Sequence, residues 1–364
     1  MGVKRYAVPA ELTGWKTQDN TGAVQFSWDY DSGREKLLSL YDKGKRRQWD
    51  AKVRIDWQHQ VDLENPLGSE DYYVPIYGSP VWERMDPAAR GELKLHLASW
   101  QFSQFLHGEQ GALICAAKIV QNVPDMDSKF YAATQVMDEA RHVEVYSTFL
   151  NKLELAYPIN PNLRSILDQV LSDSRWDMTY LGMQVLIEGL ALAAFGMIRN
   201  LTGNQLAREL TAYVMQDEAR HVAFGRNALR DYYPRLSEHE RKEREEFCAE
   251  ACNLMRSRFL AQEVWDTLGL GTDECLEWVE RSETQQAFRN LLFTRIVPVL
   301  QDIGLFGETM RSAFEKMGVL GFADTDLDAL MADDERVATE IDEARQAEVS
   351  SSIRAAMEDQ EHLS

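Results

Sequence analysis

The pattern of apolar and polar positions divides the chain into long helical stretches with few interruptions. From Asp86 the segment DPAARGELKLHLASWQFSQFLHGEQGALICAAKIVQNV opens with an Asp-Pro helix start and continues unbroken to about Val123. Three more long helical stretches follow, at roughly 126–156, 173–202 and 204–233, and no strand-like alternation of useful length accompanies them. The sequence therefore predicts an all-α body.

The regions on either side of this body differ from it in composition, and we predict three parts. Residues 1–85 are rich in turns around a single helix, GREKLLSLYDKGKRRQWDAKV, and are expected to form an arm packed on the main body. Residues 86–235 hold the four long helices. Residues 236–364 begin with a capping box made by Ser237 and Glu240, continue as helices packed on the core, and end in an acidic, Ala-rich tail.

The hexapeptide DEARHV occurs twice, 79 residues apart, and takes up two of the seven histidines of the chain. Glu139 and His142 in the first copy, like Glu218 and His221 in the second, are three residues apart and so share one helical face. A solvated helix face with salt bridges is the ordinary interpretation of such a motif. Its duplication favours a different one, in which the two copies form two halves of one site.

Two more glutamates in apolar surroundings complete the pattern. Glu109 and Glu188 each lie 30 residues before the glutamate of one copy of the repeat, and the midpoints of these intervals are Pro124 and Gly203. Both midpoints are residue types at which a helix hairpin turns. Each glutamate then lies roughly 15 residues, or ~21–23 Å, from its turn and meets its partner at the same height. Two packed hairpins would form a four-helix bundle with all these side chains at one level of its core.

Four carboxylates and two imidazoles at one level are suited to two metal ions. They can bind two divalent irons near charge neutrality, and carboxylate with imidazole also suits manganese, so a mixed Mn/Fe centre stays open. One Glu from each of two helices plus Glu-x-x-His from each of the other two is the pattern of carboxylate-bridged di-iron bundles. Four buried carboxylates without metal would be very costly. The predicted metal ligands are Glu109, Glu139, His142, Glu188, Glu218 and His221.

Residues beside the predicted ligands are candidates for supporting roles. Asp138 and Asp217 directly precede the ligand glutamates and are placed to accept a hydrogen bond from the ligand histidine of the opposite hairpin. Arg141 and Arg220 could pair with these aspartates. For all four the alternative is a solvated helix face. Tyr146 lies four residues after the first ligand histidine, so it is either a redox-active or substrate-contacting phenol or a plain core tyrosine.

With this ligand pattern the sequence resembles the ferritin-like superfamily of non-haem di-iron carboxylate proteins over about residues 88–235. The D-E-x-R-H form is similar to that of the hydroxylase subunits of bacterial multicomponent monooxygenases and, less closely, of acyl-carrier desaturases. The resemblance implies a ferritin-like four-helix bundle with additional N- and C-terminal helices, as in ribonucleotide reductase small subunits. It also implies two irons on the six ligands, and O2 activation to a peroxo or higher-valent oxidant that attacks a small organic substrate.

Three positions depart from these relatives. Leu192 replaces the threonine that follows the third ligand by four residues in the monooxygenases, which argues against C–H hydroxylation of their type. Val214 replaces the additional histidine of the arylamine N-oxygenases, so we expect no close match to that branch, although amine oxidation stays open. Tyr146 matches the radical tyrosine of ribonucleotide reductase small subunits, but those proteins usually begin the site with Asp, not Glu109, and end in a Tyr-containing tail, not EDQEHLS.

Composition and charge argue against some kinds of partner and some cellular locations. The net charge of −20 and pI of about 4.8 argue against nucleic-acid binding. The basic cluster KGKRRQW at 43–49 is either a solvated face or a docking site for a partner. Four cysteines without a CxxC pair fit a reducing cytoplasm. The start MGVKRYAVPAEL has no apolar signal core, and the run LALAAFGMI is too short to span a bilayer, so we expect a cytoplasmic protein that does not enter membranes.

The sequence thus predicts an O2-activating di-iron oxidase or oxygenase for a small organic substrate, which takes electrons from a reductase or ferredoxin. The alternatives are a radical-generating subunit like that of ribonucleotide reductase and a ferritin-type iron-handling protein. The length of the chain beyond a minimal bundle favours the oxygenase, because extra helices can shape a pocket and docking surfaces. The long C-terminal helices offer a surface for a homodimer.

Overall fold

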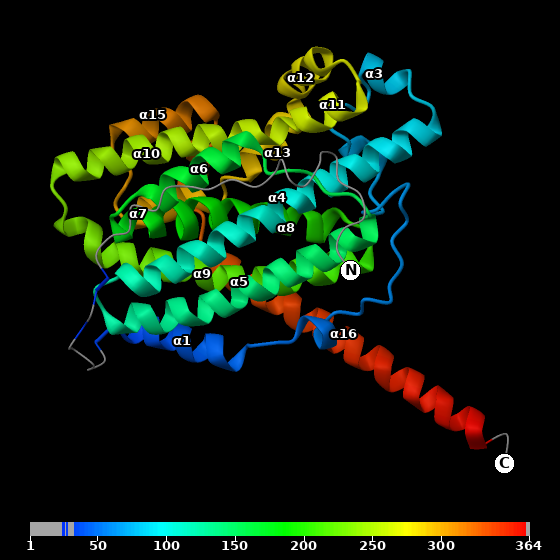
Figure 1. The fold of residues 1–364 in the computed structure, drawn as a ribbon, viewed down its shortest axis with the longest axis horizontal. Coiled ribbons are helices and arrows are strands. Elements are labelled where there is room, and N and C mark those ends of the chain that lie inside the picture. The colour runs from blue at the N-terminus through cyan, green and yellow to red at the C-terminus, as the bar shows by residue number, and fades with distance from the viewer. Residues whose placement is uncertain (1–23, 26, 28–32, 362–364) are drawn as a thin grey trace.

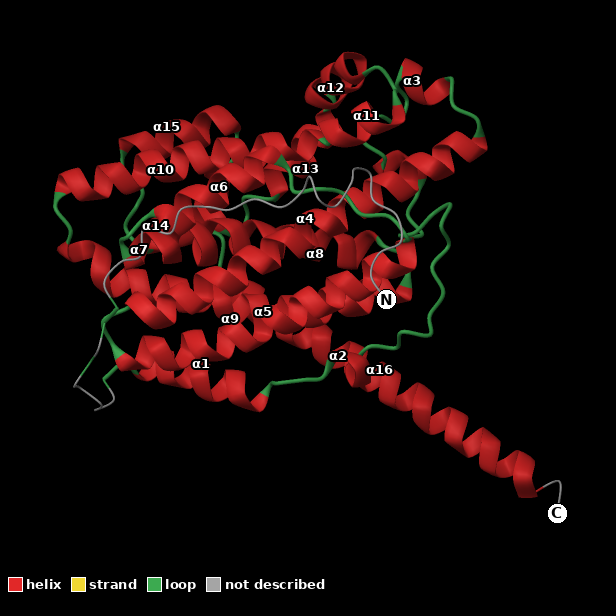
Figure 2. Cartoon of the chain, viewed as in Figure 1, coloured by secondary structure: helices red, strands yellow, loops and turns green. Residues whose placement is uncertain are grey.

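A computed structural model of the chain describes residues 24, 25, 27 and 33–361, in which every regular element is helical (Figures 1 and 2). The prediction of an all-α fold is confirmed. Four helical segments form the central bundle. They are α4 (Pro87–Asn122), α5 (Met126–Leu153), the π-helical segment η3 (Leu181–Ile187) continuing into α8 (Glu188–Leu201), and α9 (Gln205–Tyr232).

The four bundle helices form two hairpins that turn at the predicted midpoints. Helix α4 begins at Pro87 with Asp86 as its cap and ends at Asn122, directly before Val123 and Pro124. Helices α8 and α9 are separated by only three residues around Gly203, whose backbone lies against Gly68 so closely that a Cβ there would come within 2.6 Å of the Gly68 carbonyl oxygen. Both turns therefore follow from local chemistry, one from proline and one from glycine.

The third helix of the bundle is its most apolar one. The continuous run Trp176–Leu201, which includes α7 (Trp176–Tyr180), contains an 18-residue window with a mean hydropathy of 1.8 and is long and apolar enough to cross a membrane by composition. Because 78% of its most apolar window is buried inside the molecule, it is equally well suited to the centre of a bundle. The π-helical segment directly before Glu188 widens the helix there, a distortion often found at functional sites.

The N-terminal arm extends around the bundle, from one side to the C-terminal helices on the other, where Arg84 pairs with Glu274 at 3.1 Å (Figure 1). Its elements are α1 (Glu35–Arg46), α2 (Ala51–Arg54), η2 (Asp71–Tyr73) and α3 (Pro80–Glu83). Figure 1 shows α1 along α5 and α9. The single helix predicted here is wrong, because Asp50 accepts a hydrogen bond from the Lys52 amide and caps a second helix.

The remaining helices cover other parts of the bundle, most of them on the side away from α1, while the last one packs against α9 and is ion-paired to the N-terminal arm through Glu335 and Lys43 (Figure 1). They are α6 (Pro161–Ser172), η4 (Tyr233–Arg235), α10 (Glu238–Ser257), η5 (Arg258–Leu260), α11 (Gln262–Leu268), α12 (Thr272–Arg281), α13 (Glu283–Leu291), α14 (Ile296–Asp302), α15 (Glu308–Met317), η6 (Leu320–Asp324) and α16 (Leu327–Glu361). The predicted capping box of Ser237 and Glu240 is present at the start of α10. One hydrophobic core extends from Leu37 to Val319, so the three predicted parts pack together, and their division stays a prediction.

Candidate metal centre

The six predicted ligands lie together in the interior of the bundle, although they come from four helices. They are Glu109 from α4, Glu139 and His142 from α5, Glu188 from α8, and Glu218 and His221 from α9. Each side chain is at most 5% exposed. The equal spacing of the glutamates from their turns therefore brings all six to one level of the core, as the sequence predicts.

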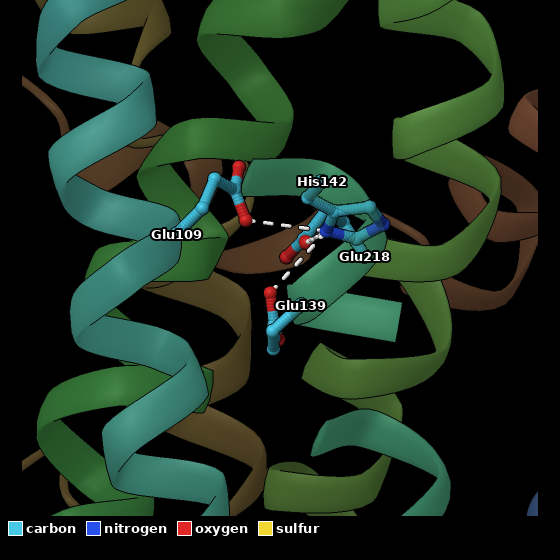
Figure 3. A group of neighbouring side chains, drawn as sticks. All are labelled: Glu109, Glu139, His142 and Glu218. Atoms are coloured by element: carbon cyan, nitrogen blue, oxygen red, sulfur yellow. Dashed lines mark hydrogen bonds and ion pairs between the residues drawn. The ribbon is translucent and has the colours of Figure 1, made fainter. Parts of the chain in front are cut away.

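The donor atoms form two overlapping groups. The first contains Glu109, Glu139, His142 and Glu218, and the second contains Glu139, Glu188 and His221, with the donor atoms of each group within 4.8 Å of one another. Figure 3 shows the first group, with its side chains pointing toward a common centre. Such groups of carboxylate and imidazole donors are suited to two metal ions that lie close together.

Two of the glutamates lie between the histidines. Nδ1 of His142 is 3.2 Å from Oε2 of Glu139 and 3.0 Å from Oε1 of Glu218. Nδ1 of His221 is 3.1 Å from Oε1 of Glu139 and 3.4 Å from Oε1 of Glu218. Glu139 and Glu218 therefore each contact both histidines and would hold metal ions together with them. Glu109 lies 3.2 Å from Nδ1 of His142 and belongs to the first group only.

Several buried polar atoms of the cluster make no hydrogen bond. They are Oε2 of Glu188 and of Glu218, and also Oε1 of Glu218 and Nδ1 of His221, whose polar contacts are the ion pairs given above. Leaving a buried donor or acceptor unsatisfied costs about 1–3 kcal/mol, and more for a charged group. Two divalent cations would give these atoms partners and balance the four carboxylates. The residues present thus fit a di-metal centre.

Bound protons also balance part of the negative charge of these carboxylates. Burial, followed by repulsion from Glu218, raises the pKa of Glu109 and of Glu188 well above the usual range. Burial acts in the opposite direction on the histidines, but their acidic partners outweigh it and raise the pKa of His142 and of His221. Metal ions that bind here would have to displace protons.

Aspartates orient both histidines, and each comes from the opposite hairpin, as predicted. Nε2 of His142 lies 3.2 Å from Oδ2 of Asp217, and Nε2 of His221 lies 3.3 Å from Oδ2 of Asp138. Each contact turns Nδ1 of the ring toward the cluster of carboxylates. Such partners fix the tautomer and the direction of a metal-binding histidine.

The two arginines of the repeat are buried with these aspartates. Arg141 pairs with Asp138 and donates from Nη2 to Oδ2 of Asp217 at 2.8 Å. Arg220 pairs with Asp217, and its Nη2 lies 3.5 Å from Oδ2 of Asp138. Because the arginines are only 5% and 1% exposed, the alternative of a solvated helix face is wrong. The four charges form one internal network that joins the hairpins.

Two residues of the N-terminal arm reach the same network. Gln48 donates from Nε2 to Oδ1 of Asp138 at 2.7 Å, and Trp49 donates from Nε1 to Oδ2 of Asp217 at 2.8 Å. Nothing in the sequence indicated these contacts, because Gln48 is 90 residues from its partner and Trp49 is 168.

Gln135 was also missed, although helical spacing could have indicated it. It lies four residues before Glu139 and so shares its face of α5. Its Nε2 donates to Oε1 of Glu139 at 2.9 Å and to Oε1 of Glu188 at 2.8 Å, while its Oε1 accepts from Gln184 at 3.4 Å. A chain of buried amides therefore holds carboxylates of both hairpins.

Tyr146 is fully buried beside the first group of ligands. Its hydroxyl makes no hydrogen bond, and its ring packs against Phe105 and Phe195. Burial, and then the charge of Glu109, raises its pKa. His107 points elsewhere, with Nε2 2.9 Å from the carbonyl oxygen of Tyr157.

Residues 31–304 match the model of the family described as P-aminobenzoate N-oxygenase AurF, which spans more than half of the chain. The chain belongs to this family. It is therefore an O2-activating di-iron oxidoreductase that acts on a small organic substrate, and its fold is the ferritin-like bundle with additional terminal helices. The expectation that Val214 separates this chain from the arylamine N-oxygenases is wrong, because one missing histidine leaves the other six donors of the centre in place.

Solved structures of other proteins share its helical architecture at low identity. An R2-like ligand-binding oxidase with aerobically reconstituted metal cofactor after photoconversion is 15% identical, with a TM-score of 0.45, over 77% of this chain and 96% of that one. The same kind of oxidase with aerobically reconstituted Mn/Fe cofactor (long soak) is 15% identical, with a TM-score of 0.38, over 83% and 95%. No curated protein matches this chain.

Proposed function

We propose that the protein transfers oxygen from O2 to the nitrogen of a small amine at a di-iron centre held by six side chains. The ligands in this proposal are Glu109, Glu139, His142, Glu188, Glu218 and His221. The observation that supports it best is the pair of overlapping donor groups that share Glu139, in a chain that belongs to the AurF family. The family match also favours an oxygenase over a radical-generating subunit or an iron store.

The protein side of this chemistry follows from the contacts. When bound, the two irons supply the electrons and the binding site with which O2 is activated. Glu139 and Glu218 would hold them together with the two histidines, while Asp138 and Asp217 direct the histidine rings. Burial of all these groups excludes bulk water, which strengthens each electrostatic interaction in the centre.

The substrate would approach through a small cavity between α4, η3, α8 and α9. This cavity has a volume of about 20 Å³ and borders Glu109, Glu188 and Glu218. A space of this size holds about one water molecule, so lining side chains must move to admit a substrate. The apolar side chains Met183 and Ile187 lie in its wall.

We also propose an electron donor, a homodimer and a cytoplasmic location for the protein. Trp49 is half-buried in a surface recess, and Asp217 lies between it and His142, so an electron donor such as a reductase or ferredoxin docked there would meet a hydrogen-bonded route to the centre. Helix α16, which extends away from the body in Figure 2, offers a surface for a homodimer. Four buried, unpaired cysteines support a reducing cytoplasm.

The test is an isotope experiment on protein loaded anaerobically with ferrous iron. The sample is analysed for iron, mixed with ¹⁸O2 and p-aminobenzoate or unsubstituted aniline, and the products are examined by mass spectrometry. We expect about two irons per chain and ¹⁸O on the nitrogen of at least one amine. Iron-free protein is the control. Label only on ring carbon, or none in any product despite two bound irons, would contradict N-oxygenation.

A further inference from the structure

Arg258 is a buried arginine without a polar partner. It is the first residue of η5, directly after α10, and is 6% exposed. Within the described part of the chain its guanidinium makes no hydrogen bond and no ion pair. The guanidinium carbon lies 4.9 Å from the ring centroid of the neighbouring Phe259, which is a cation–π contact.

Three other buried arginines of this protein pair with carboxylates. Arg141 and Arg220 lie against aspartates of the metal centre, and Arg244 donates from Nε to Oδ2 of Asp177 at 3.0 Å. Their pKa values are raised, although burial opposes this, whereas burial alone lowers the pKa of Arg258 to about 10. An unpaired buried charge is unfavourable for folding, so stability does not explain Arg258.

The position of Arg258 connects it to the proposed reaction. It lines the same cavity as Glu109, Glu188 and Glu218, so a positive group and the metal-binding carboxylates border one space. The lining also contains apolar side chains, Phe105 and Phe195 among them. A ligand in this cavity would therefore have a cation, metal-binding carboxylates and apolar side chains among its neighbours.

The α4 wall of this cavity is loosely packed at one position. Gly108 lines the cavity, and a Cβ built there would meet no atom within 4 Å. A Cβ at Gly111, one turn away, would in contrast come within 2.6 Å of Leu167. Open space beside Gly108 is therefore available when lining side chains move to admit a ligand.

We propose that Arg258 binds a carboxylate group of the substrate and thereby sets which end of the molecule faces the metal ions. The inference rests on the proposed function, since it assigns a substrate to that same cavity. A guanidinium presents a planar fork of donors that matches a carboxylate with two parallel hydrogen bonds. Binding would give Arg258 its missing partner in a site from which water is already excluded.

The experiment measures binding, so it does not depend on turnover. Metal-loaded full-length protein is titrated by calorimetry with two matched pairs, benzoate with benzamide and hexanoate with hexanamide. We expect the carboxylate of at least one pair to bind about tenfold or more tightly than its amide, as loss of a charged hydrogen bond predicts. In Arg258→Met, and in Arg258→Gln if the first variant folds poorly, this preference should disappear. Arg258→Lys should keep part of it.

A neighbouring arginine provides the control. Arg256 donates from Nη2 to Oδ1 of Asn290 at 3.3 Å and does not line the cavity, so Arg256→Met removes the same charge nearby and should leave the preference unchanged. No preference in either pair, or a preference that survives in Arg258→Met, would overturn the inference. Iron content measured on the same samples separates this result from failure of the di-iron proposal, which would appear as protein without two bound irons.

Discussion

The α4–α5 hairpin and the η3–α8–α9 hairpin supply the same kinds of donors but different surroundings. Each contributes one glutamate from its first helix and Glu-x-x-His from its second. Four residues before the second-helix glutamate, however, the first hairpin has Gln135 and the second has Val214. Gln135 holds two carboxylates, whereas Val214 is a buried apolar side chain.

A second difference lies four residues after each histidine. Tyr146 in the first hairpin packs with phenylalanines beside the first donor group. The equivalent residue of the second hairpin is Gly225, where a Cβ would come within 2.6 Å of Cβ of Gln184. Glycine thus lets the π-helical segment bring an amide close to the second group. Tyr146 and its phenylalanines adjoin the first group, whereas two amides and Tyr131, whose ring centroid is 6.5 Å from that of His221, adjoin the second, so duplicated ligands need not give two equivalent ions.

The largest effect should come from the carboxylate that belongs to both donor groups. Because Glu139 contacts both histidines, Glu139→Ala should reduce the metal content from about two ions per chain toward none. Glu109 and Glu188 each belong to one group, so Glu109→Ala and Glu188→Ala should each lose about one ion. Elemental analysis after gel filtration measures the number of metal ions per chain in each variant.

Glu144→Ala is the matched control for these variants. Its side chain is 46% exposed on the same helix as Glu139, and its one ion pair, to Lys52, is 3.7 Å long. It should keep both ions. If all four variants retained equal metal, the ligand assignment would be wrong for both hairpins.

A smaller effect is expected from Gln135→Leu, which removes the donor to Glu139 and Glu188. Loss of such an outer partner typically lowers metal affinity by about 10–100-fold. Val214→Ala changes the corresponding buried position of the other hairpin without removing a hydrogen bond, so its metal affinity should stay near that of the wild type. Competition with a chelator of known affinity measures the metal affinity of both variants. Equal affinities would mean that the amide does not distinguish the two halves.

The smallest effect concerns folding. Gly225→Ala should destabilise the protein by about 1–3 kcal/mol, because the added methyl group meets Gln184 in a packed core. Gly108→Ala places the same group in open space on another bundle helix and should change stability by less than about 1 kcal/mol, in the stabilising direction. Urea unfolding followed by circular dichroism compares them, and equal stabilities would contradict the proposed close approach of η3 to α9.

The features predicted correctly from the sequence depend on helical spacing. Glu139 and His142 share a face whatever the rest of the chain does, and a turn at Pro124 brings Glu109 to their level. The contacts that were missed join distant segments. Trp49 meets Asp217 across 168 residues, and Arg258 reaches the cavity from a short turn after α10, neither of which has a periodic signal.

The expectation drawn from Val214 is wrong because it rests on a single position, whereas the family is shown by a match over residues 31–304. The surroundings of the second donor group also depend on the other hairpin, since Gln135 donates to Glu188 at 2.8 Å.

The central claim is that two hairpins with different surroundings build one di-metal centre. Anomalous diffraction at the iron absorption edge, from crystals of protein loaded with ferrous iron, tests this most directly. The account predicts two peaks about 3.5–4 Å apart, one beside Glu109 and His142, the other beside Glu188 and His221, with Glu139 between them. A single peak, or peaks away from these side chains, would contradict it.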